Sequence, residues 1–262
     1  MKRIKRLVSL GFILSSVSLA LVGCGTDSTT GGESGEGGDK KYVVATDATY
    51  APMEYMDDKG NIVGTDIDII NALAEELDIE IEFKNYGWEP LFSAVSSEEV
   101  DFAVSSITIT DERKETYDFS DPYYFANQLI LVPEDSSVTK FEDLKDKRVS
   151  VQINTTGHKV VQGLIGKTSS EIVAVESMPM AISEMLNGNA DAAIGDNAVI
   201  LEYKKNNPKV ALKTVEDEAF EKEYYGIMVK KGNTEILELL NEGIAKLKKN
   251  GKLKEITGFD VE

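Results

Sequence analysis

The stretch TDIDIINALAEELDIEIEF, residues 65–83, predicts a helix that runs almost directly into a strand. Asp66 stands where a helix N-cap is expected. One face of this helix would carry the apolar residues Ile70, Leu73, Ala74 and Leu77. From residue 79 to residue 83 isoleucine and phenylalanine alternate with glutamate, which is the period of two of a strand. A short apolar run, YVVAT at 42–46, precedes the helix, so the order is strand, helix, strand.

The same alternation continues along the chain. A helix is expected from Trp88, where apolar residues fall at i, i+3, i+4 and i+7, and DFAVSS (101–106) reads as the next strand. This β-α-β-α-β order predicts an α/β fold with a parallel sheet covered by helices on both faces. A second set of the same kind follows, with strands at 148–152, 171–175 and 191–195 separated by helices.

Two long extended runs, ANQLILVPED (126–135) and YYGIMVKKG (224–232), bracket the second set. They predict that the chain crosses to a second domain and returns, and that the amphipathic helix ending at Asn250-Gly251 packs on the first domain. The expected domains are 42–129 plus 225–262 for the first and 130–224 for the second. A cleft between domains joined by paired crossovers can bury a ligand from both sides.

The N-terminus has the pattern of a secretion signal. A basic start, MKRIKR, is followed by an apolar run that ends in LVGC, at the sole cysteine, Cys24. This resembles a bacterial lipoprotein signal, which implies cleavage of residues 1–23 and lipidation of the Cys24 thiol; a plain signal anchor is the alternative. Residues 24–41 hold no bulky apolar side chain after the cysteine and predict a flexible tether. The folded part is then expected at the cell membrane, on its extracytoplasmic face.

The net charge of the chain limits the classes of partner that it can bind. Removal of the signal leaves 24 bases against 46 acids, a net charge of −22. Such a charge repels the phosphates of nucleic acids and of anionic lipids, so no nucleic-acid partner is expected. With Cys24 used for lipid, the chain has no further cysteine for a disulfide or a metal site.

A dense row of hydroxyl groups leads to one arginine in SSITITDERKETYDFSDPYY, residues 105–124. Residues 106–110 alternate with the period of a strand end, so one face would offer hydroxyls and the other would enter a core. Arg113 can hold a carboxylate with two parallel N–H bonds. Surface ion pairs of Arg113 with Asp111, Glu112 or Glu115 are the alternative interpretation.

Five stretches in this order resemble the polar amino-acid substrate-binding proteins of ABC importers, solute-binding protein family 3. They are TDATYAPMEYMDDKGNIVGTDIDI, AVSSITITDERKETYDFSDPYY, DLKDKRVSVQINTTG, NGNADAAIGD and YYGIMVKKGN. The resemblance covers residues 42–259. It implies a type II-like periplasmic-binding-protein fold with two α/β lobes, a monomer without cofactor or metal, and delivery of a free amino acid to an ABC permease.

The resemblance also implies roles for residues at the ends of strands. Arg113 would bind the ligand carboxylate, with hydroxyl or backbone bonds from Ser105, Ser106 and Thr108. The turn Thr155-Thr156, at the start of a helix, would meet the carboxylate from the second domain. Asp196 would take the α-ammonium. Thr156 and Asp196 could instead be simple N-caps, and Asn154 departs from the family pattern, in which a glycine precedes the Thr pair.

Four further residues are expected around the ligand side chain: Asp47, Tyr50, Trp88 and Gln152. Asp47 could accept from a lysine or arginine tip or from a glutamine amide, so both glutamine and the basic amino acids stay open. Tyr50 and Trp88 could enclose the side chain between aromatic faces, although Trp88 also falls on an apolar helix face and could belong to the core.

Two other function classes compete with a binding protein. Relatives resembling cyclohexadienyl dehydratases carry out chemistry in the same cleft, and catalysis needs a poised acid or base. The sole histidine, His158, is expected to be an exposed helix residue, so no enzyme is expected. A tethered sensor is the third class; sensors of this fold usually continue into a transmembrane or kinase segment, and this sequence ends at Glu262.

Overall fold

The computed structural model describes residues 40–261. The predicted signal peptide, the predicted lipidation site Cys24 and all but two residues of the predicted tether therefore lie outside the described residues. The first strand, β1, begins at Lys41, which the sequence assigned to the tether. None of the helices within residues 40–261 has the length and apolar character needed to cross a membrane.

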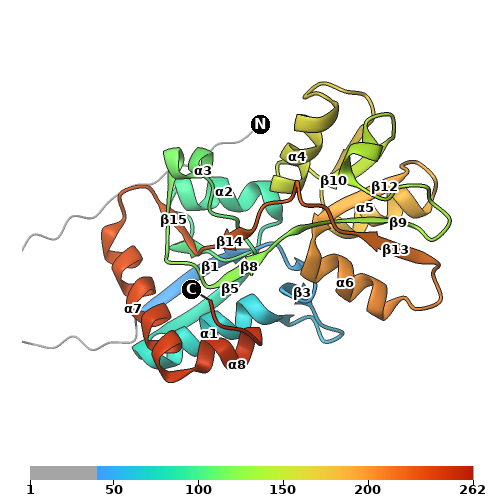
Figure 1. Ribbon diagram of the computed structural model, residues 1–262. Coiled ribbons are helices and arrows are strands. Elements are labelled where there is room, and N and C mark those ends of the chain that lie inside the picture. Colours follow the sequence, from blue (N-terminus) through green and yellow to red (C-terminus); the bar gives the residue numbers. More distant parts are fainter. Residues whose placement is uncertain (1–39, 262) are drawn as a thin grey trace, which may run out of the picture. The chain divides into compact units, whose positions relative to one another are not determined.

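The first of the two five-stranded sheets contains the N-terminal strands (Figure 1). Its order is β5 (Glu80–Asn85), β1 (Lys41–Thr46), β6 (Phe102–Ala103), β15 (Met228–Lys230) and β7 (Tyr117–Phe119). β1 pairs in parallel with β5 and β6, as the β-α-β-α-β order predicted. β15 is antiparallel to β6 and β7, so the whole sheet is mixed, because the chain re-enters it from the opposite direction.

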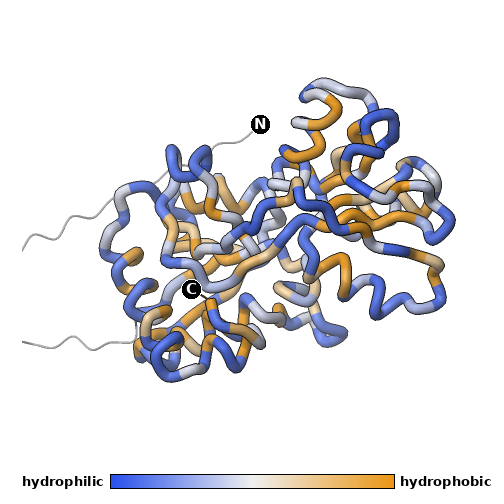
Figure 2. Tube along the Cα trace, in the orientation of Figure 1, coloured by the Kyte–Doolittle hydropathy of each residue, from blue (hydrophilic) through white to orange (hydrophobic). Residues whose placement is uncertain are grey.

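The second sheet repeats this plan. Its order is β11 (Ile172–Val175), β10 (Val149–Gln152), β12 (Ala192–Asp196), β9 (Gln128–Pro133) and β13 (Leu212–Val215). β10 is parallel to β11 and β12, and β9 is antiparallel to β12 and β13. In Figure 2 apolar residues follow these central strands while the surrounding loops are hydrophilic. Each lobe thus has its own sheet, and the two-lobed α/β fold is confirmed.

Helices cover both sheets. Those of the first lobe are α1 (Thr65–Leu77), α2 (Trp88–Ser96), α3 (Asp111–Thr116), α7 (Thr234–Asn250) and α8 (Lys252–Thr257). Those of the second lobe are the 3-10 helix η1 (Phe141–Leu144), α4 (Thr156–Ile165), α5 (Met178–Leu186) and α6 (Asn197–Asn206). α7 packs on α1 so closely that a Cβ on Gly243 would lie 2.5 Å from Cγ of Leu73. The last long helix therefore packs on the first lobe, as expected.

Two chain segments connect the lobes. β8 (Tyr124–Ala126) leads toward the second lobe, and β14 (Glu223–Tyr225) returns beside it as its antiparallel partner. A backbone bridge between Thr108 and Tyr225 joins β14 to the loop that follows β6. The residue boundaries given above for the two domains stay predictions.

A small sheet at the rim of the first lobe precedes α1, and the start of this helix corrects one prediction. The small sheet consists of β2 (Thr49–Tyr50), β3 (Glu54–Met56) and β4 (Ile62–Val63). The N-cap position belongs to Gly64, whose φ of 130° and proximity to the backbone of Met53 leave no room for a Cβ. Asp66 is not the cap but a buried residue: its Oδ2 accepts from the backbone N–H of Ser106 at 2.7 Å and from the Tyr123 hydroxyl at 2.9 Å.

Candidate ligand-binding site

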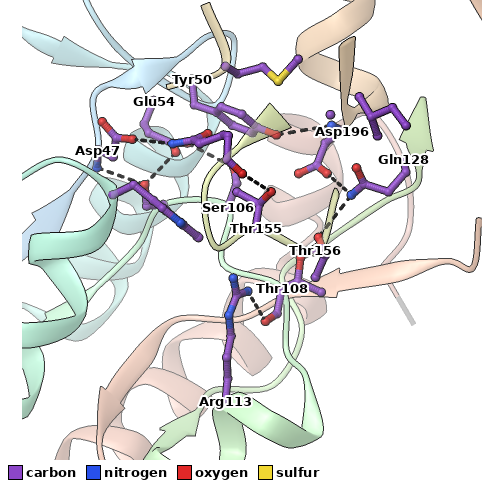
Figure 3. A pocket seen from close by; sticks show the side chains of 16 residues that line it. Asp47, Tyr50, Glu54, Ser106, Thr108, Arg113, Gln128, Thr155, Thr156 and Asp196 are labelled. Carbon is purple, nitrogen blue, oxygen red and sulfur yellow. Dashed lines mark hydrogen bonds between the residues drawn. The ribbon is translucent and has the colours of Figure 1, made fainter. Parts of the chain in front are cut away.

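A pocket with about 430 Å³ of space not filled by protein atoms, counted out to its mouth, lies between the two lobes (Figure 3). All eleven side chains expected around a ligand line it: Asp47, Tyr50, Trp88, Ser105, Ser106, Thr108, Arg113, Gln152, Thr155, Thr156 and Asp196. Five further lining residues were not expected: Glu54, Gln128, Met178, Ile194 and Gly195. The pocket has the mixed polar and apolar lining of a small-molecule site.

Arg113 is buried at the wall of the pocket, with 8% of its surface exposed. Thr110 caps α3 by accepting from the Arg113 backbone N–H, which fixes the arginine in the first turn. The guanidinium donates to the carbonyl of Thr108 at 2.8 Å and to that of Asn154 at 3.4 Å. Among the described residues no carboxylate lies within 4.0 Å of it, so the alternative of surface ion pairs does not hold.

Burial lowers the pKa of Arg113 to about 10, although the charges of Glu223 and Asp196 oppose this shift. A guanidinium in a site of this kind stays charged at neutral pH. Its charge is then balanced by no direct ionic partner among residues 40–261. A buried cation without an ion-pair partner costs several kcal/mol, and an anion that joined it would offset this cost.

Asp196 is buried at the end of β12, facing the opposite lobe. Its Oδ1 accepts from the Gln128 side chain at 2.5 Å, its Oδ2 from the Tyr225 hydroxyl, and its backbone N–H donates to the Tyr50 hydroxyl at 3.3 Å. Asp196 occupies the N-cap position of α6, yet its side chain makes no capping bond. Burial, followed by the charge of Glu223, raises the pKa of Asp196 to about 6.

The hydroxyl groups of residues 105–110 do not form the expected row. β6 ends at Ala103, and Ser106 has a φ of 48°, so the prediction of a strand end over 106–110 is wrong. Ser105 donates to Glu54 Oε1 at 2.8 Å and Ser106 donates to Glu54 Oε2 at 3.2 Å. The Ser106 N–H donates to Asp66, and this hydrogen bond stabilises the backbone turn at Ser106. This turn directs the side chains of Ser105 and Ser106 toward Glu54.

Glu54, which lines the pocket, and Asp66, which does not, form a buried pair of carboxyl groups. Burial and the nearby charge of Asp66 raise the pKa of Glu54 well above its ordinary value, and burial raises the pKa of Asp66 to about 7. Two buried carboxylates in this proximity do not both ionise at neutral pH, so the pair retains a proton.

Asp47 connects the first lobe to the second. Its Oδ2 accepts from the side-chain amide of Gln152 at 3.1 Å, and its Oδ1 accepts from the Thr49 hydroxyl at 3.0 Å. Burial raises the pKa of Asp47, and these two hydrogen bonds oppose the shift. The carboxylate therefore faces the pocket with an amide across from it and no cation beside it among residues 40–261.

Trp88 both lines the pocket and packs in the core of the first lobe. Its ring lines the pocket and stands at 86° to the ring of Phe92, with the centroids 5.0 Å apart. It also belongs to the apolar cluster that contains Leu91 and Val95. The aromatic wall of the pocket is thus anchored in the core of the first lobe, so its position is fixed before a ligand arrives.

The turn before α4 explains how Asn154 replaces a glycine. Asn154 has a φ of 57°, a conformation that asparagine tolerates better than most side chains. Its N–H donates to Nδ1 of His158 at 3.0 Å, and Thr155 caps the helix by accepting from the His158 N–H. His158 is therefore buried rather than exposed, and it does not line the pocket. Its burial lowers its pKa.

Two partners that complete this network were not predicted from the sequence. Gln128 lies in the first of the two extended runs and donates to Asp196, and Glu223 of β14 accepts from Gln128. A Cβ on Gly195 would lie 2.6 Å from Sδ of Met178, so a larger residue at this position would require the Met178 side chain to move. No group of three or more His, Cys, Asp or Glu side chains within residues 40–261 is placed to hold a metal ion.

Comparison with known proteins agrees with this geometry. A probable histidine-binding protein of Neisseria gonorrhoeae is 38% identical over 93% of this chain and 91% of its own length. The arginine-binding extracellular protein ArtP of Bacillus subtilis is 31% identical over 93% of each chain. The crystal structure of the arginine-, lysine-, histidine-binding protein ArtJ from Geobacillus stearothermophilus matches with a TM-score of 0.81 at 45% identity, covering 85% of this chain and 97% of that one.

An ancestral arginine-binding protein bound to glutamine is also similar, with 38% identity and a TM-score of 0.77 over 82% of this chain and 95% of that one. The family described as bacterial extracellular solute-binding proteins, family 3, matches residues 42–258. That span contains every residue of the pocket and, except for Lys41 at the start of β1, both five-stranded sheets. The chain belongs to the bacterial extracellular solute-binding proteins of family 3.

Proposed function

We propose that this protein is an extracytoplasmic lipoprotein that captures a basic amino acid and delivers it to an ABC permease. The observation that carries the proposal is the buried guanidinium of Arg113, which has hydrogen bonds to two carbonyls but no carboxylate within 4.0 Å among residues 40–261. The carboxylate of a free amino acid supplies the missing anion in the bidentate geometry that guanidinium groups favour.

The ammonium of the same ligand meets the carboxylate of Asp196. In the ligand-free site burial raises the pKa of Asp196, and an ammonium beside it offsets this by favouring the ionised form. Arg113 comes from the first lobe and Asp196 from the second, so one zwitterion engages both lobes at once. This explains why closure and binding are coupled in the proposed mechanism.

The side chain of the ligand lies toward Asp47 and the ring of Trp88 in this proposal. Asp47 has no cation beside it, and an aromatic face attracts a guanidinium or ammonium group. The pocket therefore favours a cationic side chain over a neutral one, and arginine, lysine and histidine are the proposed ligands. The relatives named for these amino acids support this choice. Glutamine is the second candidate, since its amide could donate to the same carboxylate.

Thermal unfolding of the full chain, stripped of ligand by refolding, tests the proposal against each of the twenty amino acids, ornithine and cystine. A ligand at about a thousand times its dissociation constant adds about 4 kcal/mol to the free energy of unfolding. The basic amino acids should raise the midpoint by several degrees. The proposal fails if none of them produces a shift, and a shift with glutamine alone would replace the proposed ligand.

Lipid anchoring through Cys24 rests on the sequence LVGC at residues 21–24. Cys24→Ala should move the protein from the detergent phase to the aqueous phase in detergent partitioning. A variant that stays in the detergent phase would refute a lipid anchor and support an uncleaved signal anchor. Delivery to a permease is tested separately, by measuring uptake of labelled arginine in cells that carry or lack the protein.

We also propose that the pocket binds its ligand without changing it. One similar structure is an ancestral amino-acid-binding protein described as a precursor of cyclohexadienyl dehydratase, so catalysis is a real alternative on this fold. The protonated Glu54–Asp66 pair is its candidate acid, but Glu54 is held by two serines and Asp66 by Ser106 and Tyr123. Recovery of chemically unchanged ligand after long incubation is the expected result, and conversion of the ligand would establish an enzyme.

A further inference from the structure

Glu223 is a carboxylate of the returning segment β14 that touches residues of both lobes. Its Oε2 accepts from the hydroxyl of Thr108 at 2.8 Å and from the hydroxyl of Thr156 at 2.7 Å. Its Oε1 accepts from the side-chain amide of Gln128 at 3.1 Å. Thr108 follows β6 of the first lobe, whereas Thr156 opens α4 and Gln128 opens β9 of the second.

The backbone fixes Glu223 on the side of the first lobe. Tyr225 forms a bridge with Thr108, and the N–H of Ile109 donates to the carbonyl of Tyr224 at 2.8 Å. The contacts of Glu223 with Thr156 and with Gln128 therefore reach across to the second lobe. If the lobes separated, these hydrogen bonds would have to break, because Thr156 and Gln128 belong to the lobe built on the second sheet.

The protons of this cluster have only one possible arrangement when Glu223 is ionised. A carboxylate accepts and does not donate, and a threonine hydroxyl has a single proton. Thr108 and Thr156 must then both direct their protons to Glu223, which leaves neither hydroxyl free to donate into the pocket. The carboxylate of a ligand would rely on Arg113 and on backbone N–H groups at the start of α4.

Glu223 does not line the pocket, but its negative charge acts on two residues that do, Arg113 and Asp196. It is the foremost of the negative charges that keep Arg113 protonated, and it opposes the ionisation of Asp196. Hydrogen bonds to a charged acceptor are stronger than neutral ones. The Glu223 carboxylate accepts three such hydrogen bonds, from residues of both lobes. These bonds therefore favour the closed arrangement of the lobes even when no ligand is bound.

We propose that Glu223 is a positioning residue, the clasp that holds the two lobes in the closed arrangement through Thr108, Thr156 and Gln128. Only the predicted effect of this clasp on ligand affinity depends on the proposed function. A ligand that binds the closed form gains apparent affinity in proportion to the closed fraction. Because Glu223 acts on closure and not on the ligand side chain, its loss should weaken every amino acid by the same factor.

Two substitutions in the full chain test the clasp. Glu223→Gln removes the charge, and Glu223→Asp keeps the charge but withdraws the carboxylate by one methylene. Glu221→Gln is the matched control, because Glu221 is exposed and its side chain forms no hydrogen bond or ion pair within residues 40–261. Isothermal calorimetry and stopped-flow dissociation with arginine, lysine, histidine and glutamine provide the readouts.

Both Glu223 variants should weaken each ligand by about tenfold, mainly through faster dissociation, and Glu221→Gln should stay within about twofold of the unmodified protein. If the Glu223 variants bind amino acids with unchanged affinity, the proposed clasp is wrong. It is also wrong if they bind more tightly, because Glu223 would then oppose ligand binding. A loss with Glu223→Asp that differs between arginine and glutamine would overturn it too, since the residue would then act on the ligand side chain.

Hydrogen–deuterium exchange of the ligand-free protein separates this inference from the proposed function. Residues 105–110 and 154–158 should exchange severalfold faster in both Glu223 variants than in Glu221→Gln, whatever the ligand is. Equal protection in these segments would overturn the clasp even if amino acids bind. If no amino acid binds the unmodified protein, the proposed function fails, while this comparison still decides the role of Glu223.

Discussion

The guanidinium of Arg113 lies over the ring of Trp88, with its Cζ 5.3 Å from the ring centroid. Phe92 flanks it at 5.5 Å, so α2 places two aromatic rings beside a cation of α3. Guanidinium groups stack on such faces because they are planar and weakly hydrated. The rings therefore replace water around the cation and leave it available to an anion in the pocket.

Replacement of Arg113 by Ala should weaken amino-acid binding by about 2 to 5 kcal/mol, because the ligand carboxylate would be buried without a partner. Arg113→Lys should recover only part of this loss, since an ammonium cannot make two parallel bonds. Arg148→Ala is the control, an exposed arginine whose Nε is 3.9 Å from Glu171. Calorimetry that finds less than a tenfold loss for Arg113→Ala would contradict the assigned role.

Asp47→Asn should change selectivity more than it changes stability. The asparagine oxygen can still accept from Gln152, and its amide nitrogen can donate to the Thr49 hydroxyl, but the side chain no longer offers a charge to a cationic ligand. Arginine and lysine should lose about tenfold or more in affinity, whereas glutamine should lose less, because a single neutral hydrogen bond contributes less than a charged one. Equal losses for arginine and glutamine in calorimetry would place the ligand side chain elsewhere.

The order of elements was readable from the sequence because it depends on local periodicity. The pattern in residues 65–83 predicted α1 and β5, and the two extended runs predicted the crossovers that contain β8 and β14. The antiparallel direction of β9 and β15 was not predicted, since a single strand carries no mark of the direction of its neighbours. The cap of α1 was misassigned because Asp66 has its partners, Ser106 and Tyr123, far away in the sequence.

The lining of the pocket was predictable where residues stand at the ends of strands, as Asp196 and Gln152 illustrate, whereas Arg113 lies in α3 and was predicted from the family resemblance of its motif. The alternating hydroxyls at 106–110 were misread, because a strand pattern cannot reveal a turn with positive φ at Ser106. Glu54 and Glu223 were missed for a different reason. Acids are abundant in this chain, and only the tertiary structure separates a buried carboxylate from the solvated ones.

Acidic pH should stabilise the ligand-free protein. Burial raises the pKa of Asp66 to about 7 and that of Asp196 to about 6, and it raises the pKa of Glu54 as well. The folded state then binds protons that the unfolded state has released, so the free energy of unfolding falls as pH rises from 5 to 7.5. His158 acts in the opposite direction because its pKa is lowered, but it is one group against three.

Thermal unfolding at pH 5 and pH 7.5 in the absence of ligand checks this sign, with a higher midpoint expected at pH 5. Asp66→Asn should flatten the dependence, since the amide oxygen can still accept from Ser106 and Tyr123 but cannot titrate. Asp68→Asn, on an exposed position of the same helix, should leave the slope unchanged. A midpoint that rises toward pH 7.5 would show that the Glu54–Asp66 pair holds no proton.

Binding of arginine should weaken as pH falls below about 6, the pKa of Asp196 in the ligand-free site. Protonation of Asp196 removes the charge that faces the ligand ammonium, while Arg113 stays protonated throughout this range. Calorimetry between pH 4.5 and 7.5 should show proton release on binding at the acidic end, because the ammonium lowers the pKa of Asp196. Affinity that is independent of pH in this range would contradict a contact between Asp196 and the ammonium.

Substitution of two glycines separates packing from helix propensity. Gly243→Ala should destabilise the protein by about 1 to 3 kcal/mol, because its Cβ would lie 2.5 Å from Cγ of Leu73 where α7 crosses α1. Gly163→Ala in α4 is the control: nothing lies within 4 Å of its Cβ, so the gain in helix propensity should stabilise by roughly 0.5 to 1 kcal/mol. Urea unfolding measures both, and a stabilising Gly243→Ala would show that α1 and α7 do not pack as closely as this structure has them.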